Sequence, residues 1–167
     1  SADGSGNVYI TGTFGGITNF DNPDSTILSG YTGHEILVAK YNSAGTLKWA
    51  KKAGGTGQDY GYAICADLEG NSYVTGVFEG TAEFETTNLT SEGLNDIFIA
   101  KYNTTGGLVW VKKAGEIYED QGNAIAVDGS GNIYITGFFN HKSTFGNITV
   151  NSFNSSIFLR CTDPETN

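Results

Sequence analysis

The sequence predicts an all-β protein built from repeats, and three observations support this. The segment DGSGNVYITG at 3–12 returns as DLEGNSYVTG at 67–76 and as DGSGNIYITG at 128–137. The segment ILVAKYNSAGTLKWAKKAGG at 36–55 returns 61 residues further on as IFIAKYNTTGGLVWVKKAGE at 97–116. No part of the chain sustains a helical period over ~10 residues. Apolar runs bounded by Gly, Asn and Asp instead indicate short strands joined by tight turns.

Each repeat is predicted to contain four strands, which we designate a to d. In the second unit these are expected at residues 63–67, 72–78, 97–102 and 108–113. The a–b connection is DLEGN or DGSGN, and the c–d connection is NSAG or NTTGG. Both are typical of short hairpin turns in which Asx side chains bond the backbone and Gly supplies positive φ.

Four-stranded antiparallel meanders repeated at a fixed period predict a β-propeller, with one unit per radial blade. The period exceeds the ~40–50 residues usual for blades, and the surplus lies between strands b and c. We interpret the surplus as an extra b–c hairpin anchored by a phenylalanine six residues after the one that ends strand b. The pairs are Phe14 and Phe20, Phe78 and Phe84, and Phe139 and Phe145.

The strand count predicts that residues 1–167 form a partial β-propeller of about three blades. Blade 1 has strands b–d at 3–55, blade 2 is complete at 56–116, blade 3 has strands a–c at 117–162, and 163–167 is a tail. Propellers usually close with ~4–8 blades. We therefore expect an incomplete ring and a chain that is part of something longer, as a fragment or within an assembly. Its open faces would be covered by the remaining blades or by neighbouring chains.

Composition excludes several classes of function. Nine Lys and Arg stand against 18 Asp and Glu, for a net charge of −9, and such a chain repels nucleic acid. No apolar run reaches the ~18–20 residues of a membrane helix, so the chain is not expected to span a membrane. Two cysteines, Cys65 and Cys161, fall in different blades and make no disulfide framework.

The core D-x-x-G-N-x-Y-x-T-G, followed by I-F-x-A-K-Y-N-x-x-G-x-x-x-W and K-A-G-G, resembles the bacterial SBBP-type β-propeller repeat. The resemblance implies a propeller in a secreted or surface protein, and hence an extracellular or bacterial cell-surface location, with no assigned enzyme activity. The third copy departs from the pattern, because Arg160 and Cys161 replace Ala100 and Lys101.

No catalytic residues are predicted. The sequence has no nucleophile elbow, zinc-protease motif or P-loop. Carboxylate pairs such as Glu83 with Glu85 are more typical of a solvated acidic surface.

Calcium is the one cofactor that the sequence raises, as an alternative. Asp3, Ser5 and Asn7 alternate as in the first half of a calcium loop, and Asp128, Ser130 and Asn132 repeat the series. Phe14 and Phe139 stand where the closing Glu of such a loop would be. We therefore favour simple Asx turns, with no metal and no other cofactor.

Ligand binding is expected on one face of the propeller. Because strands alternate in direction, the a–b and c–d turns share one face (the turn face), and the longer b–c and d–a connections share the other (the loop face). The loop-face segments differ between units and contain twelve acidic residues against Lys142. Drift in solvated loops is the competing explanation. The candidate ligand-binding residues are Asp59, Tyr60, Tyr118, Glu119 and Asp120.

The leading hypothesis is a non-catalytic binding or scaffolding module, for example in adhesion, with a glycan or a protein bound at the loop face. The alternative is a propeller lectin with repeated sugar sites between blades. Trp49 and Trp110 could serve such sites, although a Trp repeated once per blade more often packs against the next blade. A third alternative is a hydrolase or lyase whose active site lies in blades outside this chain.

Overall fold

The computed structural model describes residues 1–20, 26–31, 33–140, 142–145, 148–151 and 155–162. Blade 2 is an antiparallel meander of four strands in the order a to d. They are β6 (Tyr60–Ala66), β7 (Ser72–Phe78), β10 (Asp96–Tyr102) and β11 (Leu108–Gly115). The D-x-x-G-N turn joins the first two strands and the N-x-x-G turn joins the last two, as the sequence predicts.

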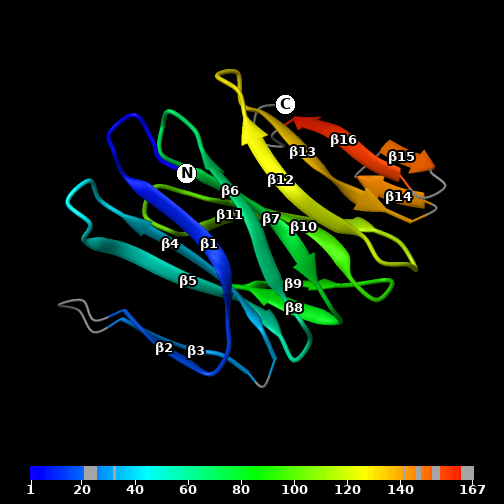
Figure 1. Cartoon of the computed structure of the whole chain (residues 1–167), viewed down its shortest axis with the longest axis horizontal. Coiled ribbons are helices and arrows are strands. Elements are labelled where there is room, and N and C mark those ends of the chain that lie inside the picture. The colour runs from blue at the N-terminus through cyan, green and yellow to red at the C-terminus, as the bar shows by residue number, and fades with distance from the viewer. Residues whose placement is uncertain (21–25, 32, 141, 146–147, 152–154, 163–167) are drawn as a thin grey trace.

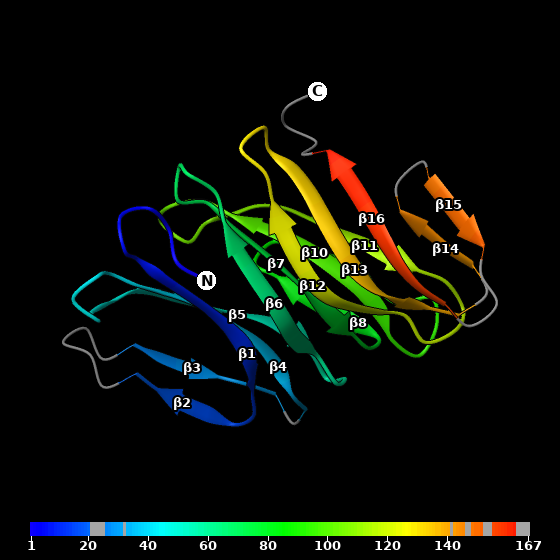
Figure 2. The same cartoon turned by 45° about the horizontal axis from the view of Figure 1, so that its top comes forward.

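Blades 1 and 3 contain the strands that the repeat alignment assigns to them. Blade 1 pairs β1 (Val8–Phe14), β4 (Glu35–Tyr41) and β5 (Leu47–Gly55) as strands b, c and d. Blade 3 pairs β12 (Gln121–Val127), β13 (Asn132–Phe139) and β16 (Ser155–Thr162) as strands a, b and c. Strands β1, β6 and β12 run side by side at the junctions of the three blades (Figures 1 and 2). The predicted fold class is confirmed: all-β, antiparallel and not closed into a ring.

The extra b–c hairpin is present in every unit, but it does not pair within its own blade. The hairpins are β2 (Ile17–Asn19) with β3 (Ile27–Ser29), β8 (Thr81–Phe84) with β9 (Thr87–Thr90), and β14 (Lys142–Phe145) with β15 (Ile148–Asn151). Strand β8 pairs with the end of β5, and β14 pairs with the end of β11. Each of these two hairpins therefore continues the sheet of the preceding blade.

Glycine at the end of strand d permits this pairing. A Cβ on Gly55 would stand 2.1 Å from the Thr81 carbonyl oxygen, which no side chain tolerates. The predicted anchor is confirmed for unit two: Phe84 is fully buried, and its ring centroid lies 5.2 Å from that of Phe98. The Phe145 side chain lies outside the described residues.

The core lies between blades rather than within one. Val38 and Trp49 of blade 1 share one buried cluster with Val74, Phe98 and Tyr102 of blade 2. A second cluster joins blades 2 and 3, where Ile97, Ile99 and Tyr73 meet Ile133 and Ile135. A single blade buries little by itself, so each depends on its neighbours for stability.

The repeated tryptophan packs against the next blade, as expected for a residue found once per unit. Trp49 on β5 stacks on Tyr102 of blade 2, with centroids 6.3 Å apart, and meets Tyr9 edge-on at 6.5 Å. Its indole N–H donates to the Thr104 carbonyl in the c–d turn of blade 2. Each such ring pair adds about 1 kcal/mol beyond the burial of its area.

One face of blade 1 is open where the corresponding faces of blades 2 and 3 are covered. Ile10 is 36% exposed, whereas its counterparts Val74 and Ile135 are 0% and 2% exposed. On the hairpin of unit one, Ile17 is 77% exposed and Ile27 is 57% exposed. These exposed side chains form the open surface of blade 1, which a further blade would cover in a larger propeller. The outer edge of β1 is paired at its start by Ser1 and Ala2.

We predict that the 167-residue chain self-associates through this surface, because exposed apolar side chains that a neighbouring blade would bury favour contact between copies. The double variant Ile10→Thr and Ile17→Lys should shift sedimentation velocity profiles toward monomer. Leu68→Ser, which removes an exposed apolar side chain from an a–b turn, is the matched control and should leave the profile unchanged. A wild-type chain that sediments as a monodisperse monomer would contradict the prediction.

Candidate functional site

The a–b turns are closed by their aspartates. In the first turn the Asp3 carboxylate accepts the backbone N–H groups of Ser5 and Asn7, the Asn7 side-chain amide and the Tyr9 hydroxyl. Asp128 accepts the same four types of donor from Ser130, Asn132 and Tyr134. These bonds account for every residue of the calcium alternative as a member of an Asx turn. The described residues also contain no group of three or more His, Cys, Asp or Glu side chains placed to hold a metal.

The turn hydrogen bonds acidify these aspartates. The side-chain and backbone N–H groups of Asn132, the backbone N–H of Ser130 and the Tyr134 hydroxyl lower the pKa of Asp128 to about 2. For Asp3, partial desolvation raises the pKa, but bonds from Asn7, Tyr9 and Ser5 outweigh it and bring the value to about 2. The charged form of each aspartate is therefore the one that the turn stabilises.

We predict that neither a chelator nor added calcium changes the thermal unfolding midpoint of the chain, because the Asp oxygens already accept protein donors. Differential scanning calorimetry with EDTA and with millimolar CaCl₂ measures this. Asp128→Ala supplies the comparison: it should lower the midpoint in both solutions, because the turn then loses its acceptor. A calcium-dependent rise in the wild type would restore the calcium alternative.

Four carboxylates of the predicted acidic face are fully buried: Glu35, Asp59, Asp96 and Asp120. They form one pair at each blade junction, with Glu35 and Asp59 at the first and Asp96 and Asp120 at the second. In each pair, the first residue begins strand c and accepts an N–H of the b–c loop, from Tyr31 or Glu92. The second accepts the N–H of Gly55 or Glu116 in the d–a loop. The pairs therefore hold the loop-face connections in place.

The two members of a pair lie close together in the interior. Gly115 has φ 147°, and a Cβ at this position would stand 2.7 Å from Asp96 Oδ1 and 3.0 Å from Asp120 Oδ2. Desolvation, together with the neighbouring charges, raises the pKa of Asp59 and of Asp120 to about 6. Desolvation also raises the pKa of Asp96.

The pairs differ in how well they are hydrogen-bonded. Both Asp59 oxygens accept backbone N–H groups, from Gly55 and from Glu79. Oε2 of its partner Glu35 has no hydrogen-bond partner, whereas at the second junction both members have such an oxygen, Oδ1 of Asp96 and Oδ1 of Asp120. The second junction therefore carries more uncompensated charge at neutral pH.

We predict that the free energy of unfolding rises by roughly 1–2 kcal/mol as the pH falls from 7 to 5. The folded chain protonates Asp59 and Asp120 near pH 6, whereas an unfolded Asp protonates near ~3.9, so protons bind the folded state first. Below pH ~4 stability should fall again, because Asp3 and Asp128 lose turn bonds as the pH approaches their lowered pKa values.

Two substitutions identify the groups responsible for this pH dependence, measured by urea unfolding from pH 4 to 8. Asp120→Asn should remove about half of the rise without loss of stability at pH 7, because its unpartnered oxygen is the atom replaced and Asp59 still titrates. Asp59→Asn should cost about 1–3 kcal/mol at pH 7, because one N–H loses its acceptor. Equal effects of the two variants would contradict this assignment.

The loop face is less acidic than the sequence indicates. The β8–β9 hairpin leaves this face, so that Glu85 pairs with Lys51 at 2.8 Å and accepts the N–H of Leu108 at the start of β11. Glu92 pairs with Lys113 at 2.8 Å. Four more carboxylates are the buried ones, and Asp21, Asp24 and the Lys142 side chain lie outside the described residues. Glu83 lies on β8 of the hairpin. Glu79, Glu116 and Glu119 remain as described carboxylates of the face.

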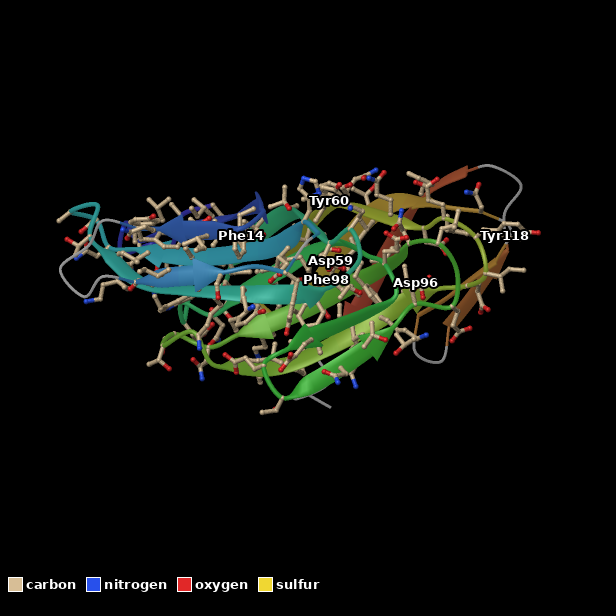
Figure 3. The ribbon with its side chains drawn as sticks, turned by 90° about the horizontal axis from the view of Figure 1, so that it is seen from below. Phe14, Asp59, Tyr60, Asp96, Phe98 and Tyr118 are labelled. Atoms are coloured by element: carbon tan, nitrogen blue, oxygen red, sulfur yellow. The ribbon has the colours of Figure 1, made fainter. Side chains whose placement is uncertain are left out.

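The five candidate ligand-binding residues are divided between two places. Tyr60 is half-buried at the junction of blades 1 and 2, with Asp59 beneath it (Figure 3). Tyr118 is 44% exposed and lies with Glu119 and Asp120 at the junction of blades 2 and 3. Figure 3 shows Tyr60 and Tyr118 well apart, so they do not form one site. The assignment of ligand binding to these residues remains a prediction.

Tyr60 belongs to a group of aromatic rings that the sequence analysis did not identify. Its ring stacks on His34 with centroids 5.4 Å apart and on Tyr62 at 6.0 Å. The Tyr60 hydroxyl donates to Gln58 Oε1, which also lies within hydrogen-bond distance of His34 Nδ1. His34 is 26 positions before Tyr60 in the sequence, so no local pattern could reveal the contact. We designate His34, Tyr60 and Tyr62 the aromatic row.

Cys65 offers no nucleophile. It lies on β6 while Cys161 lies on β16, in different blades. Burial raises the pKa of the Cys65 thiol to about 12, so the thiolate is scarce at neutral pH.

Comparison with known proteins agrees with this architecture. Residues 48–77 and 109–137 match the family described as SBBP, beta-propeller repeat. These two segments of the chain are similar to SBBP β-propeller repeats. Each match runs from strand d of one blade to strand b of the next. An SBBP repeat thus spans a blade junction, including the d–a loop and its buried aspartate.

Two longer proteins are similar to the chain. An uncharacterized WD repeat-containing protein of Acanthamoeba polyphaga mimivirus is 29% identical over 92% of this chain and 12% of its own length. The regulatory protein FlaEY of Caulobacter vibrioides is 27% identical over 62% of this chain and 11% of its own length. The chain therefore spans about a tenth of either relative. None of its described residues forms a helix that could cross a bilayer.

Proposed function

We propose that the chain is a non-catalytic binding or scaffolding module of a longer protein, secreted or displayed on a cell surface, and that it binds a protein partner at its loop face. The SBBP repeats and the similarity to a WD repeat-containing protein support a binding or scaffolding role. The lengths of both relatives support membership of a longer chain. Within the described residues, the buried carboxylates accept backbone N–H groups of the loops, and the Cys65 thiol is held protonated by burial. These contacts stabilise the fold and support a non-catalytic role.

One observation supports the loop face as the place where the partner binds. Residues that hold the fold are the same in both junctions, such as the pairs Asp59 with Asp120 and Gly61 with Gly122. Residues exposed around them differ: the first junction presents its aromatic row, and the second presents Leu94, Ile117 and Tyr118, all at least 44% exposed. A constant frame that carries different exposed side chains is typical of a binding surface on a rigid scaffold.

The lectin alternative has its own supporting feature, on the turn face. A cavity of about 340 Å³ lies between the a–b turns of blades 2 and 3, lined by Leu68, Asn71, Tyr73, Lys101 and Asp128 among others. Its volume lies within the range of small-molecule sites. Hydroxyl, amide and ammonium groups could bind sugar hydroxyls there. Trp49 and Trp110 do not line it, because they pack between blades.

We predict that protein ligands, rather than glycans, bind the chain. Fluorescently labelled wild type should give signals on a peptide array, and the double variant Tyr60→Ser and Tyr118→Ser should weaken them. Leu68→Ser, which changes the cavity on the turn face, is the matched control and should leave them intact. Signals on a glycan array that Leu68→Ser abolishes would instead establish the lectin alternative, and two silent arrays would contradict both.

A further inference from the structure

The aromatic row is fixed by the backbone of the blade junction. The Asp59 N–H donates to the His34 carbonyl at 2.9 Å, so the b–c loop and the d–a loop pair directly in front of the row. The equivalent bond joins Asp120 to Asn95 at the second junction. This backbone hydrogen bond therefore holds His34 against Tyr60. The bond forms in both junctions and does not depend on the aromatic side chains.

A β-bulge positions the last ring. Strands β6 and β7 shift register between Gly61 and Ala63, which leaves Tyr62 without a cross-strand partner. Its side chain is 42% exposed. Bulges commonly turn a side chain out of a sheet beside functional sites. Blade 3 has the same bulge, between Gly122 and Ala124.

The fold does not require aromatic residues at these positions. Their counterparts 61 positions later are Asn95, Gln121 and Asn123, and the second junction adopts the same pairing and the same bulge with them. The row thus exposes a tyrosine where the repeat itself accepts a polar residue. The aromatic side chains are therefore not required by the pairing or by the bulge, and they are available to contact a ligand.

The surroundings of the row are negative and rich in hydrogen-bond acceptors. The Glu79 carboxylate accepts the N–H of Gln58, next to the rings. Asp59, the residue before Tyr60, is fully buried. The described residues of the b–c and d–a loops at this junction include no Lys or Arg, and the chain has a net charge of −9. Lys52 of β5 contacts the b–c loop at Ser29 and lies 3.6 Å from Glu35. Aromatic faces beside carboxylates attract cations, and a guanidinium can both stack on a ring and donate to oxygens.

We propose that the aromatic row, with Gln58 and Glu79, binds an arginine side chain of a basic segment in the partner protein. The inference rests on the proposed function, because it specifies the ligand of the same face. The guanidinium stacks on the exposed face of Tyr62. The Glu79 carboxylate, which lies next to Gln58 at the same junction, attracts its charge. A neutral glycan could also stack on Tyr62 and donate hydroxyl hydrogen bonds to the carboxylate, but it carries no positive charge for the carboxylate to attract.

The test uses the 167-residue chain and short acetylated, amidated peptides in which Arg alternates with Gly. The same peptide with citrulline in place of Arg is the matched ligand, since it keeps the shape and removes the charge. Maltohexaose is the neutral glycan. Binding is followed by NMR shifts of the His and Tyr ring resonances, which detect weak complexes.

The variants copy the second junction, so the repeat itself shows that the substitutions are compatible with the fold. His34→Asn, Tyr60→Gln and Tyr62→Asn together should weaken binding of the Arg peptide by roughly fivefold or more. Glu79→Asn alone should weaken it and reduce its salt dependence. Tyr118→Ser, at the other junction, should have no effect.

Several results would overturn the inference. They are equal binding of the citrulline peptide, binding unchanged in the triple variant, binding of maltohexaose alone, and no binding of the Arg peptide. In each case the peptide array still decides the proposed function independently. Array signals that depend on the loop face but not on Arg would keep that function and reject this ligand.

Discussion

Apolar contact between successive blades is the interaction on which the rest of the structure depends. Both buried clusters cross a blade junction, and no blade has a core of its own among the described residues. Trp49 illustrates the requirement: it belongs to β5, yet it stacks on Tyr102 and donates to Thr104, both in the next blade. Stability therefore passes along the chain from neighbour to neighbour.

The features that distinguish these repeats serve that contact. The b–c hairpin of one unit pairs with strand d of the unit before it, which adds backbone hydrogen bonds to the side-chain packing. A Cβ on Gly61 would stand 2.2 Å from Thr11 Oγ1 of blade 1, so glycine lets the inner strand of blade 2 approach. The buried carboxylates hold the loops at the same junction. Hydrophobic packing, strand pairing and the loop hydrogen bonds thus all stabilise the junction between neighbouring blades.

The same junction that stabilises the fold presents its variable side chains. Asp59 and Asp120 occupy equivalent buried positions, while the exposed residues around them are aromatic in one case and aliphatic with Tyr118 in the other. The cost of burying two carboxylates together is a raised pKa near 6 for Asp59 and Asp120. Binding and stability therefore depend on different residues. The buried aspartates hold the loops in position, and the exposed side chains around them determine which ligand the junction can bind.

The sequence by itself determined the repeat, the strand order, the Asx turns and the role of Trp49, because each depends on local turn chemistry or on identity between units. It could not determine where the b–c hairpin pairs, because that pairing joins residues from two units with no local signal, as at Gly55 and Ala82. It also overestimated the acidity of the loop face. Charge can be counted from the sequence, but burial of Glu35 and Asp96, or pairing of Glu85 with Lys51, depends on contacts between distant segments. The aromatic row was decided by tertiary structure alone, because the two loops that align His34 with Tyr60 meet only when neighbouring blades pack.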